Sequence, residues 1–221
     1  TNTSSPKTAA SVEISSTQPC LCVFDIDRTL TGKQNDVYYC PRNKVMTGVH
    51  DGAYGSGDLT LSALAAEGIS NTFCGQCYLG ICSAGDAGGD NSEERTVLLD
   101  QVLKTPLYEA LRAKVSSASW WSWSDNIQSP LVLGSPNTEK QYSVEGIRRW
   151  YQQEGISISS SNVYFFGDRR ENIPPFAHLG FNAKEISCES RDPWLYGGSG
   201  MVGYCGATPE EVVAETGVKN C

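Results

Sequence analysis

The chain has 221 residues, 39% of them hydrophobic, which suits a single globular domain with a core of ordinary size. Its 25 acidic and 17 basic residues give a formal charge of -8, which argues against nucleic acid or an anionic membrane surface as a partner. No apolar run approaches the roughly 20 residues that are needed to cross a bilayer. The sequence therefore predicts no membrane span.

Nine cysteines are a high count for a cytosolic enzyme of this length and favour a secreted protein or an oxidising lumen, with the cytoplasm as the alternative. Because the count is odd, at least one thiol should stay unpaired or bridge chains. Cys22 and Cys82 lie in apolar, strand-like runs, where we interpret them as small buried hydrophobes. Cys74 and Cys77 favour a local disulfide or two separate bridges over a zinc site. Seven cysteines nearer turns form the expected disulfide pool: Cys20, Cys40, Cys74, Cys77, Cys188, Cys205 and Cys221.

The predicted domain organisation is a flexible arm over residues 1–19 and one globular domain over residues 20–221. The arm holds nine Ser or Thr and almost no apolar residues, so burial cannot offset the entropy of ordering it. Within the domain, short runs rich in β-branched and aromatic residues predict buried strands. These runs are Leu21–Ile26, Tyr78–Cys82, Val163–Phe166 and Ala183–Ile186, with Leu131–Leu133 as a fifth candidate.

Helical patterns separate these runs. Apolar residues at fourfold spacing over Arg95–Val115 predict helix, which Pro106 should divide in two. A second helix should start at an Asn137 or Thr138 cap, bury a stripe of Val144, Ile147 and Tyr151, and stop at Gly155. A third should run over Pro174–Leu179 and end at Gly180.

Strands that alternate with helices predict an α/β fold, in which a parallel sheet lies between two helical layers in a three-layer, Rossmann-like arrangement. Residues 31–73 interrupt the alternation because they are rich in Gly, Asn and Asp, with one short helical stretch at Leu59–Glu67. We expect this segment to form a small, loop-rich insert after the first strand, placed over the site.

Acidic residues follow two of the predicted strands. Asp25 and Asp27 end the run CVFDID, and Asp168 ends the run VYFFGD. Because parallel strands end at one edge of the sheet, we expect these carboxylates to converge there, and such crowding needs a cation or a proton. Mg²⁺ suits oxygen ligands of this kind. An isolated Asp-x-Asp is far more often an ordinary turn, so the prediction depends on the other strand ends.

Two further side chains fit the same edge. Ser83 ends another strand with a hydroxyl that can donate to a phosphoryl oxygen, and Lys140 can offset negative charge in a transition state. With these residues in place, the chain resembles the haloacid dehalogenase superfamily of phosphohydrolases. The first motif of that family matches Asp25, Asp27 and Thr29, and the second matches Ser83. The third falls on Lys140, with Arg148 or Arg149 as lesser candidates, and the fourth on Gly167-Asp168, with Asn172 where many members carry another Asp.

The resemblance implies a Mg²⁺-dependent phosphatase that works through an aspartyl-phosphate. Asp25 would be the nucleophile and Asp27 the acid and base. Asp25, Asp168 and the backbone carbonyl of Asp27 would hold Mg²⁺, while Thr29, Ser83 and Lys140 would bind the phosphoryl group. The substrate would be a phosphorylated small molecule or an exposed phosphate on a larger one. The alternatives are a weakly active or inactive binding protein and a phosphotransferase or mutase.

Two other signals carry less weight. Gly198–Gly203 fits a dinucleotide-binding pattern, but it neither follows a clear strand nor opens a helix, so we interpret it as a glycine-rich loop. Trp120, Trp121 and Trp123 favour packing in the core or between subunits, with stacking of a leaving group as the alternative. The sequence predicts neither the oligomeric state nor the disulfide pairing.

Overall fold

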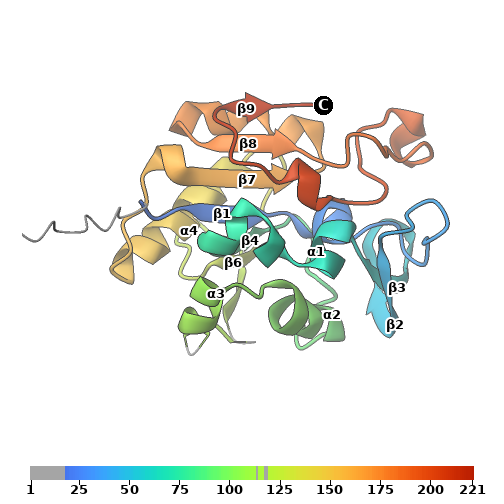
Figure 1. Cartoon of the computed structure of the whole chain (residues 1–221), viewed down its shortest axis with the longest axis horizontal. Coiled ribbons are helices and arrows are strands. Elements are labelled where there is room, and N and C mark those ends of the chain that lie inside the picture. The colour runs from blue at the N-terminus through green and yellow to red at the C-terminus, as the bar shows by residue number, and fades with distance from the viewer. Residues whose placement is uncertain (1–17, 113, 117–118) are drawn as a thin grey trace, which may run out of the picture.

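The computed structural model describes residues 18–112, 114–116 and 119–221. Of the predicted arm, residues 1–17 lie outside this part. A seven-stranded sheet with the order β5-β6-β4-β1-β7-β8-β9 forms the centre, and every neighbouring pair is parallel (Figure 1). Its strands are β1 (Leu21–Phe24), β4 (Tyr78–Cys82), β5 (Trp120–Ser122), β6 (Leu131–Leu133), β7 (Val163–Gly167), β8 (Asn182–Glu185) and β9 (Val218–Lys219).

The central strand β1 is fully buried and pairs with β4 on one side and β7 on the other. Such a strand reads as a continuous apolar run, because both faces of a parallel sheet are covered. Helix α4 (Lys140–Gln153) packs against β4 and β6, and α3 (Pro106–Leu111) also packs against β4. The predicted α/β class and parallel sheet are confirmed, and the arrangement is consistent with a Rossmann-like three-layer fold.

Helix α4 shows how far local sequence specifies the elements. Its predicted apolar stripe is buried, and Gly155 takes a left-handed φ of +86° just after the helix ends. The predicted cap is wrong: Glu139 occupies the N-cap position and makes no side-chain cap bond. Asn137 and Thr138 instead bond to Asn172, which follows the neighbouring strand β7. A tertiary contact therefore sets the start of this helix.

The helical region after β4 is divided as predicted. It consists of α2 (Glu93–Val97), the helical turn η5 (Leu98–Val102) and α3, which begins at Pro106. The turn η9 (Pro174–Leu179) ends at Gly180, which is left-handed with a φ of +67°. The remaining short turns are η1 (Ile26–Leu30), η2 (Ala53–Gly55), η3 (Ile69–Asn71), η4 (Phe73–Gln76), η7 (Ser160–Asn162), η8 (Arg170–Asn172), η10 (Leu195–Gly198) and η11 (Pro209–Glu211).

The insert after β1 has more regular structure than predicted. It contains an antiparallel pair, β2 (Lys44–Asp51) and β3 (Gly57–Leu61), followed by α1 (Ala63–Glu67). Leu59 to Leu61 therefore belong to a strand, and the expected helix starts only after them. In Figure 1 the β2–β3 pair lies beyond the carboxyl ends of β7 and β8. Most of β2 is exposed or half-buried, which explains why its sequence has no buried-strand pattern.

Four disulfides pair eight of the nine cysteines and include every member of the predicted pool. The interpretation of Cys22 as unpaired is wrong, because Cys22 forms a disulfide with Cys74. The Cα atoms of the two residues are 5.9 Å apart. Cys82 is the free thiol; it is buried, and burial raises its pKa to about 11. The pairs are Cys20–Cys77, Cys22–Cys74, Cys40–Cys205 and Cys188–Cys221. Their number is consistent with a secreted protein or an oxidising compartment.

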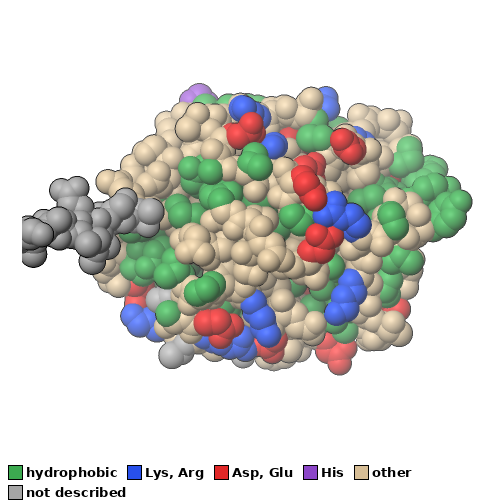
Figure 2. Space-filling model, viewed as in Figure 1, with side chains coloured by type: hydrophobic (Ala, Val, Ile, Leu, Met, Phe, Trp, Pro, Cys, Tyr) green, Lys and Arg blue, Asp and Glu red, His purple; other side chains and the backbone are tan. Residues whose placement is uncertain are grey.

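Two features of the surface bear on the sequence predictions. Of the helices among the described residues, none is long and apolar enough to cross a membrane. Figure 2 shows acidic and basic side chains interspersed on one face. Trp120 and Trp121 lie in β5 and pack against the core, as the packing interpretation expects, whereas Trp123 is exposed.

Candidate functional site

The candidate site lies at the carboxyl ends of β1 and β7. Phe24 pairs with Phe166, so Asp25 lies beside Gly167 and next to Asp168 across the two strands. The Asp25 amide donates to the carbonyl of Phe166 at 2.9 Å, which fixes the first residue after β1. The sheet therefore brings together two acidic residues that are 143 positions apart in the chain, as the sequence predicts.

Asp25 is 3% exposed and forms an ion pair with Lys140, which is 1% exposed. Its Oδ2 accepts from Lys140 Nζ, and its Oδ1 accepts from the amide of Ile26 at 2.9 Å. Burial by itself would lower the pKa of Lys140, but the charge and hydrogen bond of Asp25, together with the charges of Cys82 and Asp168, outweigh burial and raise that pKa. The lysine is therefore a fixed positive charge inside the site.

Asp168 is 1% exposed and has one satisfied and one unsatisfied oxygen. Its Oδ2 accepts from the amide of Gly203 at 2.8 Å, while Oδ1 is buried and has no hydrogen-bond partner among the described residues. Burial and then the charge of Asp25 raise the pKa of Asp168 well above its usual range. A buried oxygen without a donor is costly, so Oδ1 fits a cation or a proton.

Gly203 belongs to the glycine-rich loop that the sequence analysis sets aside. A Cβ at this position would lie 2.8 Å from the Cβ of Ser187 and 3.1 Å from the carbonyl of Arg28. A side chain is therefore excluded where the backbone must approach Asp168. The loop contributes a backbone amide to this site. Its resemblance to a dinucleotide-binding pattern does not reveal this contact.

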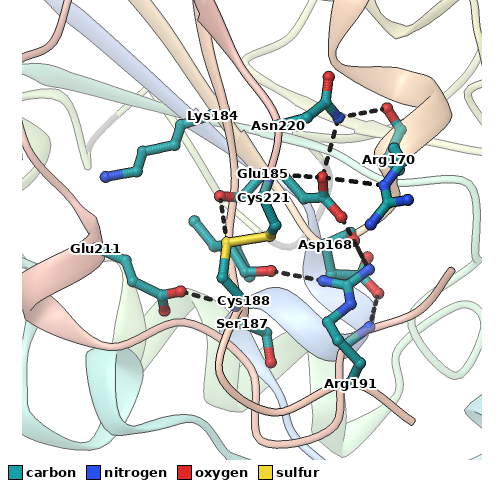
Figure 3. Close-up of a disulfide and its surroundings, with 12 residues drawn as sticks. Asp168, Arg170, Lys184, Glu185, Ser187, Cys188, Arg191, Glu211, Asn220 and Cys221 are labelled. Carbon is teal, nitrogen blue, oxygen red and sulfur yellow. Dashed lines mark hydrogen bonds and ion pairs between the residues drawn. A yellow bond between two sulfur atoms is a disulfide. The ribbon is translucent and has the colours of Figure 1, made fainter. Parts of the chain in front are cut away.

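A network of hydrogen bonds and ion pairs supports the backbone of Asp168 (Figure 3). Arg191 donates to the carbonyl of Asp168 at 2.7 Å and pairs at 3.1 Å with Glu185, which is completely buried at the end of β8. The other oxygen of Glu185 accepts from the side chain of Asn220 and from the amide of Cys221, both at 2.9 Å. The Cys188–Cys221 disulfide anchors this last contact, so the C-terminal residues help to position Asp168.

Asp27 occupies a partly exposed position in η1, where Arg28 is left-handed with a φ of +59°. Burial and the charges of Asp25, Asp51 and Asp168, in that order, raise the pKa of Asp27 to about 7. The positive charge of Lys140 only partly opposes them. At neutral pH the group is therefore populated in both protonation states, which suits an acid–base role.

Ser83 and Thr29 differ in their relation to Asp27. A Cβ at Gly85 would lie 2.7 Å from Asp27 Oδ2 and 4.0 Å from Ser83 Oγ, so both side chains border the same small space. Thr29 is fully buried, and its hydroxyl has no hydrogen-bond partner among the described residues. The backbone carbonyl of Thr29 accepts a hydrogen bond from the amide of Ala207 at 2.9 Å, which ties η1 to the segment around Ala207.

Asn172 stands where the resemblance leads one to expect a further acid. Its Oδ1 accepts from the amide of Thr138 at 2.7 Å, and its Nδ2 donates to Asn137 Oδ1 at 3.1 Å. Both partners immediately precede α4, whose first residue is Lys140. Asn172 therefore helps to place the lysine, a role that only the tertiary contact reveals. Arg148, one of the lesser candidates for the cationic role, pairs with Glu145 instead, as does Arg149.

A compact acidic cluster that the sequence analysis did not identify lies beside this site. It consists of Asp27, Asp51 at the end of β2 and Glu94 in the first turn of α2, with one oxygen from each within 4.8 Å of the others. Burial and then the charges of Asp51 and Asp27 raise the pKa of Glu94 to about 8. No local pattern in the sequence links the three residues, because the fold of the insert is what brings Asp51 to Asp27.

The residues at the sheet edge fit a hard divalent cation. Asp25 and Asp168 offer carboxylate oxygens, and the unpartnered Oδ1 of Asp168 has a lone pair with no competing donor among the described residues. A cation there would also reduce the repulsion between the two carboxylates. The predicted ligand pair is thus chemically suited to Mg²⁺.

A cavity of about 730 Å³ lies elsewhere, beside the Cys40–Cys205 disulfide. Its lining includes Arg42, Lys184 and Glu211 but none of the acidic residues at the ends of β1 and β7. We therefore place the candidate site at the sheet edge and not in this cavity. No model of a known protein family matches the chain, and no curated protein sequence matches it either.

Proposed function

We propose that the protein is a Mg²⁺-dependent phosphomonoester hydrolase that acts through an aspartyl-phosphate and has the chemistry of the haloacid dehalogenase superfamily. The observation that carries this proposal is the buried Asp25–Lys140 ion pair beside Asp168. An acidic nucleophile, a fixed cation and a carboxylate with a free oxygen converge at one sheet edge. This combination is suited to the transfer of a phosphoryl group.

In the first step, a carboxylate oxygen of Asp25 attacks phosphorus and the bond from phosphorus to the leaving oxygen breaks. Asp27 donates its proton to that oxygen, and an acyl phosphate remains on Asp25. In the second step, Asp27 takes a proton from water as the water attacks phosphorus, which releases phosphate and restores Asp25. A pKa of about 7 for Asp27 supports both roles near neutral pH.

Lys140 and Ser83 would hold the transferred group. The charge of Lys140 offsets the negative charge that spreads over the phosphoryl oxygens in the transition state. Ser83, buried at the end of β4, offers a hydroxyl beside Asp27. Asp25 and Asp168 would hold Mg²⁺, which when bound neutralises phosphoryl oxygens and orients the phosphate.

The substrate class is a phosphorylated small molecule or an exposed phosphate on a larger one. The insert that brings Asp51 beside Asp27 is built around the short pair β2 and β3, and we expect it to be a small cover over the site. A site with so small a cover is accessible to the phosphate group of a bulky substrate.

The test is the release of phosphate from an aryl phosphate with Mg²⁺ present, for the wild type and Asp25→Asn. We expect the variant to lose at least about a thousandfold in kcat. Asp125→Asn, which changes an exposed aspartate in the loop after the edge strand β5, should match the wild type. Acid quenching followed by mass spectrometry should detect one added phosphoryl group on the Asp25 peptide during turnover.

Three results would contradict the proposal. Equal activity in Asp25→Asn would exclude the assigned nucleophile. Tight binding of phosphate without hydrolysis by the wild type would favour a binding protein. Delivery of the phosphoryl group to an acceptor other than water would instead identify a phosphotransferase or mutase with the same first step.

A further inference from the structure

The acidic cluster of Asp27, Asp51 and Glu94 has features that the proposed reaction does not require. Its three members come from η1, β2 and α2, so three separate segments deliver oxygens to one small volume. Among the described residues, none of the three carboxylates forms an ion pair with a lysine or an arginine. The charge gathered there has no direct counterion within that part of the chain.

Two unsatisfied oxygens provide an independent indication of a ligand. Glu94 is 1% exposed, and its Oε1 is buried without a hydrogen-bond partner among the described residues. Gln34 is 5% exposed and donates through Nε2 to Asp51 Oδ2 at 3.0 Å. Its own Oε1 is buried and also has no hydrogen-bond partner among the described residues. Buried acceptors are normally satisfied, so each of these oxygens lacks a donor or cation that the described residues do not supply.

The loop after β4 leaves room for such a group. A Cβ at Gly85 would lie 2.7 Å from Asp27 Oδ2, and one at Gly88 would lie 3.2 Å from Glu94 Oε2. The atoms nearest to the Gly85 position belong to Asp27 and Ser83, whereas the Gly88 position also meets Ser92 Cβ at 3.0 Å. The space beside Gly85 therefore borders oxygen atoms, which suits an ion more than an apolar ligand.

We propose that the acidic cluster binds one calcium ion beside the Asp25–Asp168 edge, in competition with the proton that Asp27 carries in the proposed reaction. Calcium takes oxygen ligands at 2.3–2.6 Å, so two of its ligands lie at most about 5 Å apart, and the 4.8 Å limit of the cluster falls within that span. Calcium also accepts an irregular set of ligands, whereas magnesium requires near-octahedral contacts. The calcium site does not depend on the proposed phosphatase activity.

Isothermal titration of CaCl₂ into the full chain tests the site, with excess MgCl₂ present to occupy the sheet edge. The wild type should bind one calcium ion. Asp51→Asn combined with Glu94→Gln should weaken binding at least about tenfold, because two of three charged ligands become neutral. Asp168→Asn should retain calcium binding. A wild type that binds no calcium, or a double variant that binds it unchanged, would overturn the proposal, as would a loss confined to Asp168→Asn.

A second pair of variants leaves every ligand in place. Gly85→Ala adds a methyl against Asp27 Oδ2, whereas Gly52→Ala adds one whose nearest atom is His50 Nε2 at 3.8 Å. Neither position has a positive φ, so both variants should fold. Calcium should raise the thermal midpoint of the wild type and of Gly52→Ala, and raise it less in Gly85→Ala. An equal rise in all three would argue against a site at the cluster.

Discussion

The buried ion pair between Asp25 and Lys140 gives a prediction that does not depend on any assay of function. Removal of one partner from a buried pair leaves an uncompensated charge, which costs about 3–5 kcal/mol of unfolding free energy. Lys140→Met should reach the upper end, because Asp25 and Asp168 both lose the charge that faces them. Asp25→Asn should fall at the lower end, because Asp168 still stabilises the lysine.

The double variant separates the pair from other effects. With both charges gone, replacement of a buried pair by neutral groups costs only about 0–2 kcal/mol, so the double variant should be more stable than Lys140→Met alone. The interaction energy of the cycle should therefore be at least about 4 kcal/mol. An exposed control pair, Lys114 with Glu154, should give about 0–1 kcal/mol in the same cycle.

Urea unfolding monitored by circular dichroism, with EDTA present and the disulfides intact, measures all of these variants. Costs of Asp25→Asn and Lys140→Met that add to within about 0.5 kcal/mol would refute the reasoning, because additivity means that the two side chains do not interact.

Three further predictions concern stability. In the metal-free protein, the raised pKa of Glu94 means that the folded state holds a proton which the unfolded state releases, so the free energy of unfolding should fall as the pH rises from about 4.5 to 8. Glu94→Gln should reduce this pH dependence in urea titrations, and an unchanged pH dependence would contradict the prediction. Glu185→Gln removes the carboxylate that pairs with Arg191 and should cost about 3 kcal/mol in the same assay, whereas a cost near zero would show that the network is not coupled. Replacing Cys188 and Cys221 with Ser opens a loop of 33 residues and should cost about 3–4 kcal/mol by chain entropy; an unchanged thermal midpoint would exclude this.

Sequence reasoning predicted the elements whose signals are local. The buried strands show up as apolar runs because both faces of a parallel sheet are covered, and Pro106, Gly155 and Gly180 mark helix boundaries through their own backbone restrictions. The convergence of Asp25 and Asp168 follows from the rule that parallel strands end at one edge. These features require no knowledge of contacts distant in sequence.

The missed features depend on such contacts. The strand β2 is largely exposed, so hydrophobic periodicity does not reveal it, and the position of Asp51 beside Asp27 could not be predicted. The predicted N-cap of α4 was wrong because Asn172, more than 30 residues away, forms hydrogen bonds with Asn137 and Thr138, the two residues that were expected to cap the helix. Cys22 was misjudged because burial suits a free thiol and a disulfide equally.

The two disulfides of β1 have a consequence for the opposite end of that strand. Cys20 is joined to Cys77, which immediately precedes β4, and Cys22 is joined to Cys74 in the preceding turn η4. These two covalent links prevent β1 from sliding along β4. A slip of two residues would move Asp25 by about 6.6 Å and take it out of reach of Lys140. Exchanging the partners would yield an isomer with the same number of bonds but a different alignment. Correct oxidation therefore fixes the strand alignment on which the proposed reaction depends.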